Sequence, residues 1–336
     1  MTFSVWFFGW GPPNVLIQVY LASVMAYAFL ALLGGLVTLS LGADGLVRGA
    51  SSLARRLGMT PLVVGLTVVA LGTSMPELMV SLSAAFRGSA DLALGNVIGS
   101  NIANIGLILG TSALIAPLRV QAQVIRFDVP VLVGVSVALS LLLIRPTVDA
   151  VDGGLLVLGL IAYVGFNVWA ARREQSRAVQ KEFGDQVPMQ ASLWTDVLYL
   201  AGGLVLLLVG ARLLVDGAIT IAERIGIGEA IIGLTVVALG TSLPELATSV
   251  VAAARGEGDI AVGNAIGSSI FNILGILGTT ALVQPLATQN IRTMDSGAML
   301  GITILLLPLM RTGYRLKRWE GLLLLAAYVG YVVSLF

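Results

Sequence analysis

Long hydrophobic runs, separated by short polar segments, occupy almost the whole chain. A bilayer core of about 30 Å is crossed by a helix of about 20 apolar residues, so these runs predict ten membrane-spanning helices. Residues 1–26 precede the first run, and they either lengthen the first helix or lie at the membrane surface. The predicted helices lie near residues 28–56, 60–86, 91–116, 127–145, 151–171, 195–223, 229–254, 259–284, 294–310 and 319–335.

The predicted helices divide into two halves that share a repeated sequence. Gly65–Leu78 has nearly the same residues as Gly233–Leu246, and each copy is followed at equal spacing by a second motif, Gly95–Asn101 or Gly263–Ser269. The offset is about 168 residues throughout, and roughly 31 of 51 positions match across this region without a gap. Because each half holds an odd number of helices, the second copy must enter the membrane upside down, as in many secondary transporters.

We therefore expect an all-α polytopic membrane protein with ten transmembrane helices in two inverted five-helix repeats. The first repeat takes in residues 27–171 and the second takes in residues 195–336. A polar cytoplasmic linker at 172–194 joins them, and we interpret it as a solvated connector. Residues 1–26 form an N-terminal extension without a counterpart in the second half.

Basic residues gather on one side of this predicted topology. With the N-terminus outside, about 13 of the 19 Lys and Arg residues fall in loops of one face and about 4 in loops of the other. Since cytoplasmic loops carry the excess, we expect an integral protein of a prokaryotic plasma (inner) membrane with both termini outside. Within helices, Asp44 and Arg48 align with Arg212 and Asp216, which predicts either a salt bridge inside each helix or crossed pairing between helices that slide.

Composition narrows the chemistry that such a protein can perform. Hydrophobic residues make up 57% of the chain, charged residues 11%, and the mean hydropathy is +0.97, which identifies an integral membrane protein. The net charge of +1 gives no reason to expect a nucleic-acid partner. The absence of Cys and His removes disulfides, thiol chemistry and the usual zinc or copper ligands. The remaining oxygen ligands suit hard cations such as Ca2+ or Na+ as transported ions, and we expect no cofactor and no catalytic residue.

Each copy of the first motif places a proline and a glutamate inside an apolar segment, at Gly72–Glu77 and Gly240–Glu245. Proline cannot donate to the carbonyl four residues back, so we expect the helix predicted at 60–86 to break at residues 70–74 and to start again near Pro76. Broken backbone at membrane depth is tolerated only where it lines a buried or hydrated cavity. No basic residue lies in either run, so ligation of a cation is the favoured role of the two glutamates.

The second motif supplies the other wall of the predicted site. Its glycines allow helices to approach closely, and packing alone is the simpler interpretation of them. A serine and an asparagine recur four residues apart in each copy and therefore share one helix face. Asn96 and Asn264 are equally suited to satisfying broken backbone and to binding an ion. The predicted cation site contains Glu77, Glu245, Thr73, Ser74, Thr241, Ser242, Ser100, Ser268, Asn104 and Asn272.

The doubled sequence Gly-Thr-Ser-X-Pro-Glu, each time followed by Gly-Asn-X-Ile-Gly-Ser, closely resembles the sodium/calcium exchanger family of the cation/Ca2+ exchanger superfamily. The resemblance covers nearly the whole chain from about residue 28. It implies that Glu77 and Glu245 are the Ca2+ carboxylates, and that main-chain and hydroxyl oxygens of Thr73 and Thr241 bind Ca2+ or Na+. The outer Na+ sites that it implies are formed by Ser74, Ser242, Ser100, Ser268 and the carbonyls of Ala70 and Ala238.

The chain departs from part of the family at Asn104 and Asn272, because members often carry Asp in one repeat there. The pocket therefore lacks a possible third carboxylate, which leaves the coupling stoichiometry and the dependence on K+ open. The proton/Ca2+ branch places an acidic residue where Gly99 and Gly267 stand, which favours Na+ as the coupling ion. We expect an antiporter that exchanges Ca2+ for Na+ by alternating access. The alternatives are an H+/Ca2+ antiporter, a cation channel and an intramembrane hydrolase. A repeat of broken helices suits a channel less well than an antiporter. A hydrolase needs two acids with different pKa values, whereas the two glutamates have nearly identical sequence surroundings.

Overall fold

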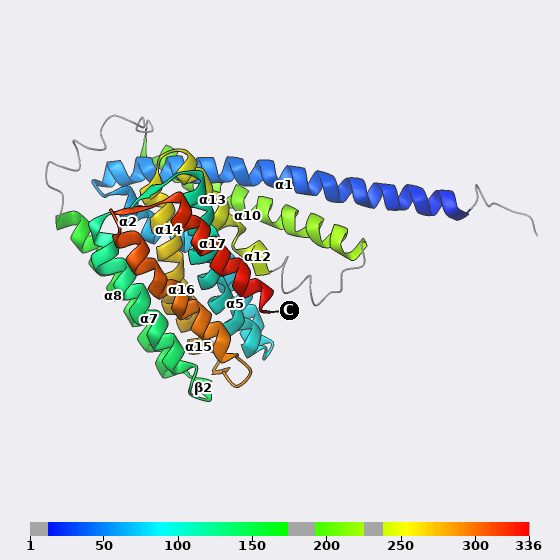
Figure 1. Ribbon diagram of the computed structural model, residues 1–336. Helices are drawn as coiled ribbons and strands as arrows, with labels where there is room; N and C mark the ends of the chain where they lie inside the picture. Colours follow the sequence, from blue (N-terminus) through cyan, green and yellow to red (C-terminus); the bar gives the residue numbers. More distant parts are fainter. Residues whose placement is uncertain (1–12, 174–191, 225–237, 336) are drawn as a thin grey trace, which may run out of the picture.

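The structure is a computed structural model that describes residues 13–173, 192–224 and 238–335, and these are almost entirely helical (Figure 1). Seven of the described helices are long and apolar enough to cross a membrane, or up to eight when one bent pair counts as a single span. Each predicted hydrophobic run has a helical counterpart in this part of the chain. The run predicted at 229–254 lies partly outside it, and the last run forms a helix of 16 residues, shorter than the roughly 20 that cross a bilayer core.

In the first half the helical elements, with π-helical turns labelled η, follow the order predicted from hydropathy. The long α1 begins at Pro13, so residues 13–26 do lengthen the first helix. The elements are α1 (Pro13–Leu57), α2 (Pro61–Val64), η1 (Gly65–Val69), α3 (Ala70–Thr73), α4 (Met75–Phe86), α5 (Ala90–Ile102), η2 (Ala103–Leu109), α6 (Gly110–Ile115), β1 (Leu118–Arg119), η3 (Val124–Asp128), α7 (Val129–Leu142), β2 (Thr147–Val148) and α8 (Ala150–Arg173).

The second half repeats this order as far as it is described, except that the stretch equivalent to η3 is α-helical. Its elements are α10 (Leu193–Arg224), α12 (Ala238–Thr241), α13 (Leu243–Ala254), α14 (Gly258–Phe271), η5 (Asn272–Leu277), α15 (Gly278–Val283), β3 (Leu286–Ala287), α16 (Thr293–Arg311), β4 (Arg315–Leu316) and α17 (Arg318–Val333).

The two longest helices, α1 and α10, lie side by side across one side of the bundle (Figure 1). Glycines bring their backbones together: a Cβ added to Gly42 would lie 2.7 Å from the amide nitrogen of Leu207, and one added to Gly203 would lie 2.5 Å from that of Leu46. At one end Arg56 also donates to the buried carboxylate of Asp196 over 2.6 Å. Small residues of this kind allow membrane helices to pack closely, so α1 and α10 form a tightly joined pair.

The predicted helix break is present in the first half. The segments Pro61–Thr73 and Met75–Phe86 meet at an angle of 44°, with Ser74 between them, and Pro76 stands in the first turn of the new helix. In the second half α12 and α13 are likewise separated at Ser242. The π-helical turns η1, η2, η3 and η5 were not predicted, and such turns are frequent at functional sites.

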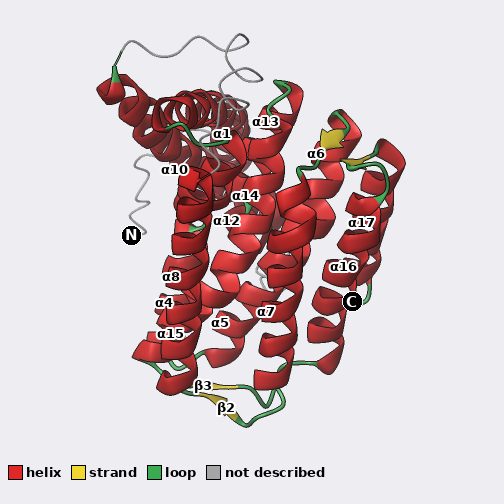
Figure 2. Ribbon diagram, turned by 90° about the vertical axis from the view of Figure 1, so that its left-hand side faces the viewer, coloured by secondary structure: helices red, strands yellow, loops and turns green. Residues whose placement is uncertain are grey.

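Two pairs of two-residue strands join the loops of one half to those of the other, a feature that the all-helical expectation did not contain. Leu118 pairs with Leu316 in the first pair, and Thr147 pairs with Ala287 in the second, both antiparallel. Figure 2 shows β2 and β3 at the lower end of the bundle and the other pair near α6 at the upper end. The halves are therefore linked at both ends of the bundle.

Helix α14 lies at the centre of the fold. Every residue from Ile260 to Phe271 is buried. Two of its glycines touch the backbone of the first half, because a Cβ on Gly263 would lie 2.7 Å from the Leu62 carbonyl oxygen and one on Gly267 would lie 2.6 Å from that of Leu66. This close approach brings the second motif of one half against the helix that leads to the break in the other.

Candidate cation site

The two glutamates occupy equivalent places at the start of the helices that follow the breaks. Glu77 lies in the first turn of α4 and Glu245 in the first turn of α13, each directly after a proline. Their exposed fractions are 2% and 1%. Because helix N-termini present unpaired N–H groups and a positive dipole end, these positions favour a carboxylate that is otherwise expensive to bury.

Hydrogen bonds cross between the halves at these carboxylates. Ser74 Oγ, at the break of the first half, donates to Glu245 Oε1 over 2.9 Å. Ser242 Oγ, at the break of the second half, donates to Glu77 Oε1 over 3.1 Å. The break in each half therefore carries the hydroxyl that holds the carboxylate of the other half, and neither half forms this arrangement alone.

The threonines that precede these serines follow the same crossed pattern, with Thr73 beside Glu245 and Thr241 beside Glu77. Thr73 Oγ1 also lies 3.1 Å from Asn264 Oδ1 and is fully buried. Ser268 Oγ lies 3.5 Å from the Ala70 carbonyl oxygen, at the helical turn just before the break. The two threonines thus lie beside the crossed carboxylates, and Ser268 contacts the helical turn that leads to the break of the first half.

Among the residues of the predicted site, four buried oxygens have no hydrogen-bond partner within the described part of the chain: Oε2 of Glu77 and of Glu245, and Oδ1 of Asn104 and of Asn272. Asn104 is the second residue of the π-helical turn η2 and Asn272 is the first residue of η5; η2 packs against α13 and η5 against α4. A buried acceptor without a donor destabilises the fold by about 1–3 kcal/mol, so four of them around one centre suit a ligand that supplies positive charge.

The remaining predicted residues lie on the same helices. Ser100 is buried on α5, at the turn that corresponds to Ser268 on α14. Ala238 begins α12, next to residues outside the described ranges. Among the described residues no group of three or more His, Cys, Asp or Glu side chains could hold a metal ion. The available ligand set is therefore two carboxylates together with neutral oxygens.

Four polar residues support the site, and the sequence interpretation left their role open or missed it. Asn96 Nδ2 donates to the Glu77 carbonyl oxygen over 3.1 Å and to Ser81 Oγ over 2.9 Å. In the second half Asn264 Nδ2 makes the same contacts with Glu245 O and Ser249 Oγ, over 3.3 and 3.0 Å. The two asparagines thus anchor the helices that carry the carboxylates. Each serine stands four residues after its glutamate, and this repeated spacing was the signal available in the sequence.

A helical bundle of membrane-spanning length, with paired carboxylates and unsatisfied oxygens at its centre, defines a membrane ion-transport protein rather than a soluble enzyme. The model of the sodium/calcium exchanger protein family matches residues 27–169 and 195–336. The chain belongs to the sodium/calcium exchanger family, and it is a cation/Ca2+ antiporter.

Several curated proteins are similar over nearly their whole length. The putative antiporter CaxA of Alkalimonas amylolytica is 41% identical, over 93% of this chain and 99% of the relative. The inner membrane protein YrbG of Escherichia coli is 38% identical, over 93% and 98%. The sodium/calcium exchanger MaX1 of Methanosarcina acetivorans is 35% identical, over 92% and 98%.

The fold is also similar to that of a solved exchanger. The structure of the sodium-calcium exchanger NCX_Mj soaked with zero Na+ and Ca2+ matches with a TM-score of 0.81 and 33% identity, over 93% of this chain and all of that one. With 2.5 mM Na+ and 0.1 mM Ca2+ present, the NCX_Mj structure matches with a TM-score of 0.80. The family predicted from the doubled motif is confirmed by these similarities.

Proposed function

We propose that this antiporter exchanges Ca2+ for Na+ by alternating access, and that the crossed carboxylates Glu77 and Glu245 bind Ca2+. The observation that carries the proposal is the pair of buried Oε2 atoms left without donors, each on a carboxylate held in place from the opposite half. Ca2+ takes six to eight oxygen ligands, and two carboxylates balance its charge. Asn104 and Asn272 would add neutral oxygens.

Na+ would use oxygens that surround the carboxylates, so that the two ions compete for a shared pocket. Occupancy by either kind of ion neutralises Glu77 and Glu245 and allows the conformational change. An empty pocket carries two negative charges, so the protein does not change access without a bound ion. This rule couples the two fluxes without leak. The oxygens proposed for Na+ belong to Thr73, Thr241, Ser74, Ser242, Ser100, Ser268, Ala70 and Ala238.

For the architecture we propose ten spans in two inverted repeats, with residues 27–171 and 195–336 as the repeats and 172–194 as a cytoplasmic linker. The strand pairs support this arrangement, because β1 and β2 of the first half align with β3 and β4 of the second at an offset of about 168 residues. The aligned elements pair crosswise, β1 with β4 and β2 with β3, and the two pairs lie at opposite ends of the bundle (Figure 2).

The orientation can be tested directly because the chain contains no cysteine. We expect Ser4→Cys, near the N-terminus, to react with an impermeant thiol reagent on intact cells, and Ser176→Cys, in the linker, to react only after the membrane is opened. The physical reason is the excess of Lys and Arg on the linker side. The reverse labelling pattern, or equal labelling, would overturn the proposed topology.

Sodium coupling is supported by the nature of the pocket and by the relatives. Beyond Glu77 and Glu245 the proposed ligands are hydroxyls, amides and carbonyls, which bind Na+ and do not titrate. MaX1 is named a sodium/calcium exchanger, and two of the similar NCX_Mj structures were soaked with Na+ together with Ca2+ or Sr2+. The alternative is an H+/Ca2+ antiporter in which the two glutamates carry the protons.

The deciding experiment is uptake of radioactive Ca2+ into proteoliposomes under an imposed ion gradient. An outward Na+ gradient without K+ should drive Ca2+ inward, and a pH gradient in Na+-free medium should not. Lower pH should reduce the Na+-driven rate, because protonation of Glu77 or Glu245 removes a Ca2+ ligand and its charge. Robust uptake driven by a pH gradient alone would establish the proton-coupled alternative.

A further inference from the structure

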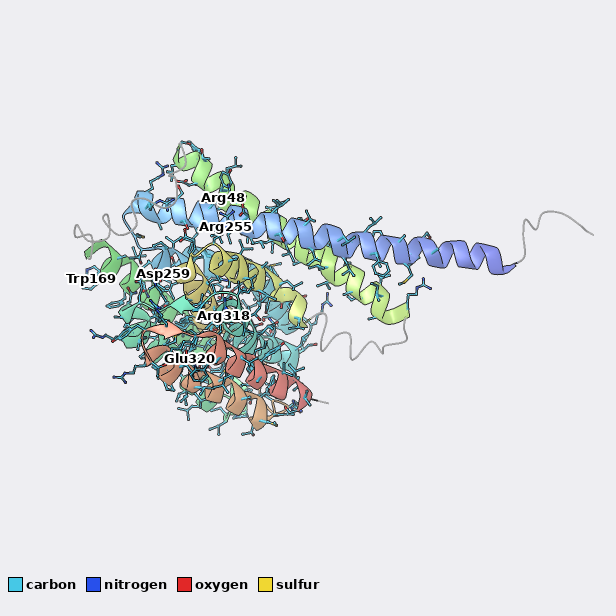
Figure 3. The ribbon with its side chains drawn as sticks, turned by 45° about the horizontal axis from the view of Figure 1, so that its top comes forward. Arg48, Trp169, Arg255, Asp259, Arg318 and Glu320 are labelled. Atoms are coloured by element: carbon cyan, nitrogen blue, oxygen red, sulfur yellow. The ribbon has the colours of Figure 1, made fainter. Side chains whose placement is uncertain are left out.

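An ion pair connects the long helix α1 to the bundle. Asp44, in the last third of α1, is within salt-bridge contact of Arg255, in the turn that follows α13. The same carboxylate lies 2.9 Å from Arg48 Nε on its own helix. Figure 3 shows Arg48 and Arg255 next to each other where α1 crosses the end of α13. The intrahelical pairing predicted from the sequence is present, and Arg255 is an additional partner.

The two elements joined by this pair are distinct mechanical units. Helix α1 packs most extensively on α10, through glycine contacts such as Gly42 with Leu207 and through Arg56 with Asp196. Its contact with α13, one of the helices that carries a site glutamate, is much smaller. If α1 and α10 move together over the bundle, the Asp44–Arg255 pair must form in one position and break in another.

The internal repeat does not reproduce this pair on the other face of the protein. At an offset of about 168 residues, Arg255 corresponds to Arg87, and Asp44 corresponds to Arg212. Arg87 is exposed at the end of α4. Arg212 is 85% exposed and lies 3.9 Å from Asp216 of its own helix. The residues equivalent to this attractive pair are therefore two like charges, Arg212 and Arg87.

We infer that Asp44 and Arg255 form a one-sided latch that favours the conformation closed at the cytoplasmic end of the pathway. The inference rests on the proposed alternating access, in which the two halves exchange conformations and Arg255 lies on the basic, cytoplasmic side. Exchange moves α1 away from Arg255 and brings α10 towards Arg87, where Arg212 offers repulsion in place of attraction. The latch thus biases an otherwise symmetric equilibrium toward outward access.

The test compares Arg255→Gln with the unmodified protein in oriented proteoliposomes. The apparent half-saturation for Ca2+ is measured separately from the cytoplasmic and the external side. Since apparent affinity scales with the population of the accessible state, the ratio of the cytoplasmic to the external value reports the equilibrium between the two states. Loss of a partly exposed ion pair should lower this ratio about 1.5- to 5-fold.

Matched variants separate the latch from general destabilisation. Arg255→Lys should largely restore the ratio, because the charge is retained. Arg48→Gln removes only the intrahelical partner and should not lower the ratio. Arg87→Gln relieves the repulsion on the other face and should lower the ratio less than Arg255→Gln does, because Arg212 is 85% exposed and its charge is well screened. An unchanged ratio in Arg255→Gln, or an equal decrease in Arg48→Gln, overturns the inference.

A cross-link checks the geometry independently of transport. In the double variant Asp44→Cys/Arg255→Cys a short bis-methanethiosulfonate reagent, which takes the place of the long arginine side chain, should cross-link the two positions and stop exchange, and a reductant should restore it. If the protein does not couple Ca2+ to Na+, the proposed function fails in the unmodified protein, while the cross-link still forms. If exchange is normal and no cross-link forms, the latch is wrong and the proposed function stands.

Discussion

The two copies of the repeated motif have the same chemistry in different surroundings. Around the carboxylates they are alike, since Ser74 and Ser242 make equivalent crossed hydrogen bonds. The second-motif helices differ: α14 is buried from Ile260 to Phe271, whereas Leu92 on α5 is 58% exposed. Duplication has thus preserved the groups that face the centre, while the packing behind them has diverged.

The largest expected effect concerns the symmetric part of this comparison. Glu77→Gln and Glu245→Gln should each abolish Ca2+ transport, because each removes one anionic oxygen of a site that needs two charges for one Ca2+. The measurement is Na+-driven Ca2+ uptake, with gel filtration in detergent to verify folding. Near-normal exchange by both variants would contradict the assignment, and loss in only one would show that the carboxylates are not equivalent.

The packing difference predicts unequal effects of the same substitution at aligned glycines. A methyl group on Gly267 meets the Leu66 carbonyl oxygen at 2.6 Å, so Gly267→Ala should destabilise the protein by about 1–3 kcal/mol through overpacking. No described atom lies within 4 Å of a Cβ on Gly99. Gly99→Ala should therefore be neutral or stabilise by up to about 1 kcal/mol, as alanine does in helices.

Thermal unfolding in detergent measures this difference, with both variants compared at one ion concentration. Equal destabilisation at positions 99 and 267 would mean that both glycines lie in equally tight interfaces. The helices α5 and α14 would then differ in solvent exposure but not in how closely they pack.

The smallest expected effect tests the supporting hydrogen bonds. Ser81→Ala and Ser249→Ala each remove an acceptor of the asparagine that anchors a carboxylate helix. A single hydrogen bond contributes about 0.5–1.5 kcal/mol, so Ca2+ affinity should fall roughly 2- to 12-fold. Calorimetric titration with Ca2+ measures it, and conservative Ser→Thr changes at both positions serve as controls. Unchanged affinity would show that the amides hold the helices without these hydroxyls.

Much of the architecture was predictable because hydropathy and proline act locally. The hydrophobic runs located the helices, and Pro76 located the break at Ser74 to within a residue or two. The crossed pairing of Ser74 with Glu245 was not predictable in detail, since it joins residues 171 positions apart. The two-residue strands have no periodicity to detect, and the π-helical turns depend on the helices packed around them.

Charge pairs illustrate the same limit. The spacing of Asp44 and Arg48 predicted their contact within one helix, because residues four apart always face each other. Nothing in the spacing identified Arg255 as a third member, since that contact depends on how α1 crosses α13. The site residues on one motif could be grouped from sequence, but the supporting contacts between Asn96 and Ser81 required the three-dimensional fold.

The crossed hydrogen bonds have a consequence for inheritance. Over Gly65–Leu78 and Gly233–Leu246 the two copies differ only at Met75 and Leu243. A mutation that removes the hydroxyl of Ser74 acts on the carboxylate of the other half, so no copy can change its own break without altering its partner's acid. Selection on the motif of one half therefore depends on the motif of the other half, and the two motifs should evolve together long after the duplication that separated them.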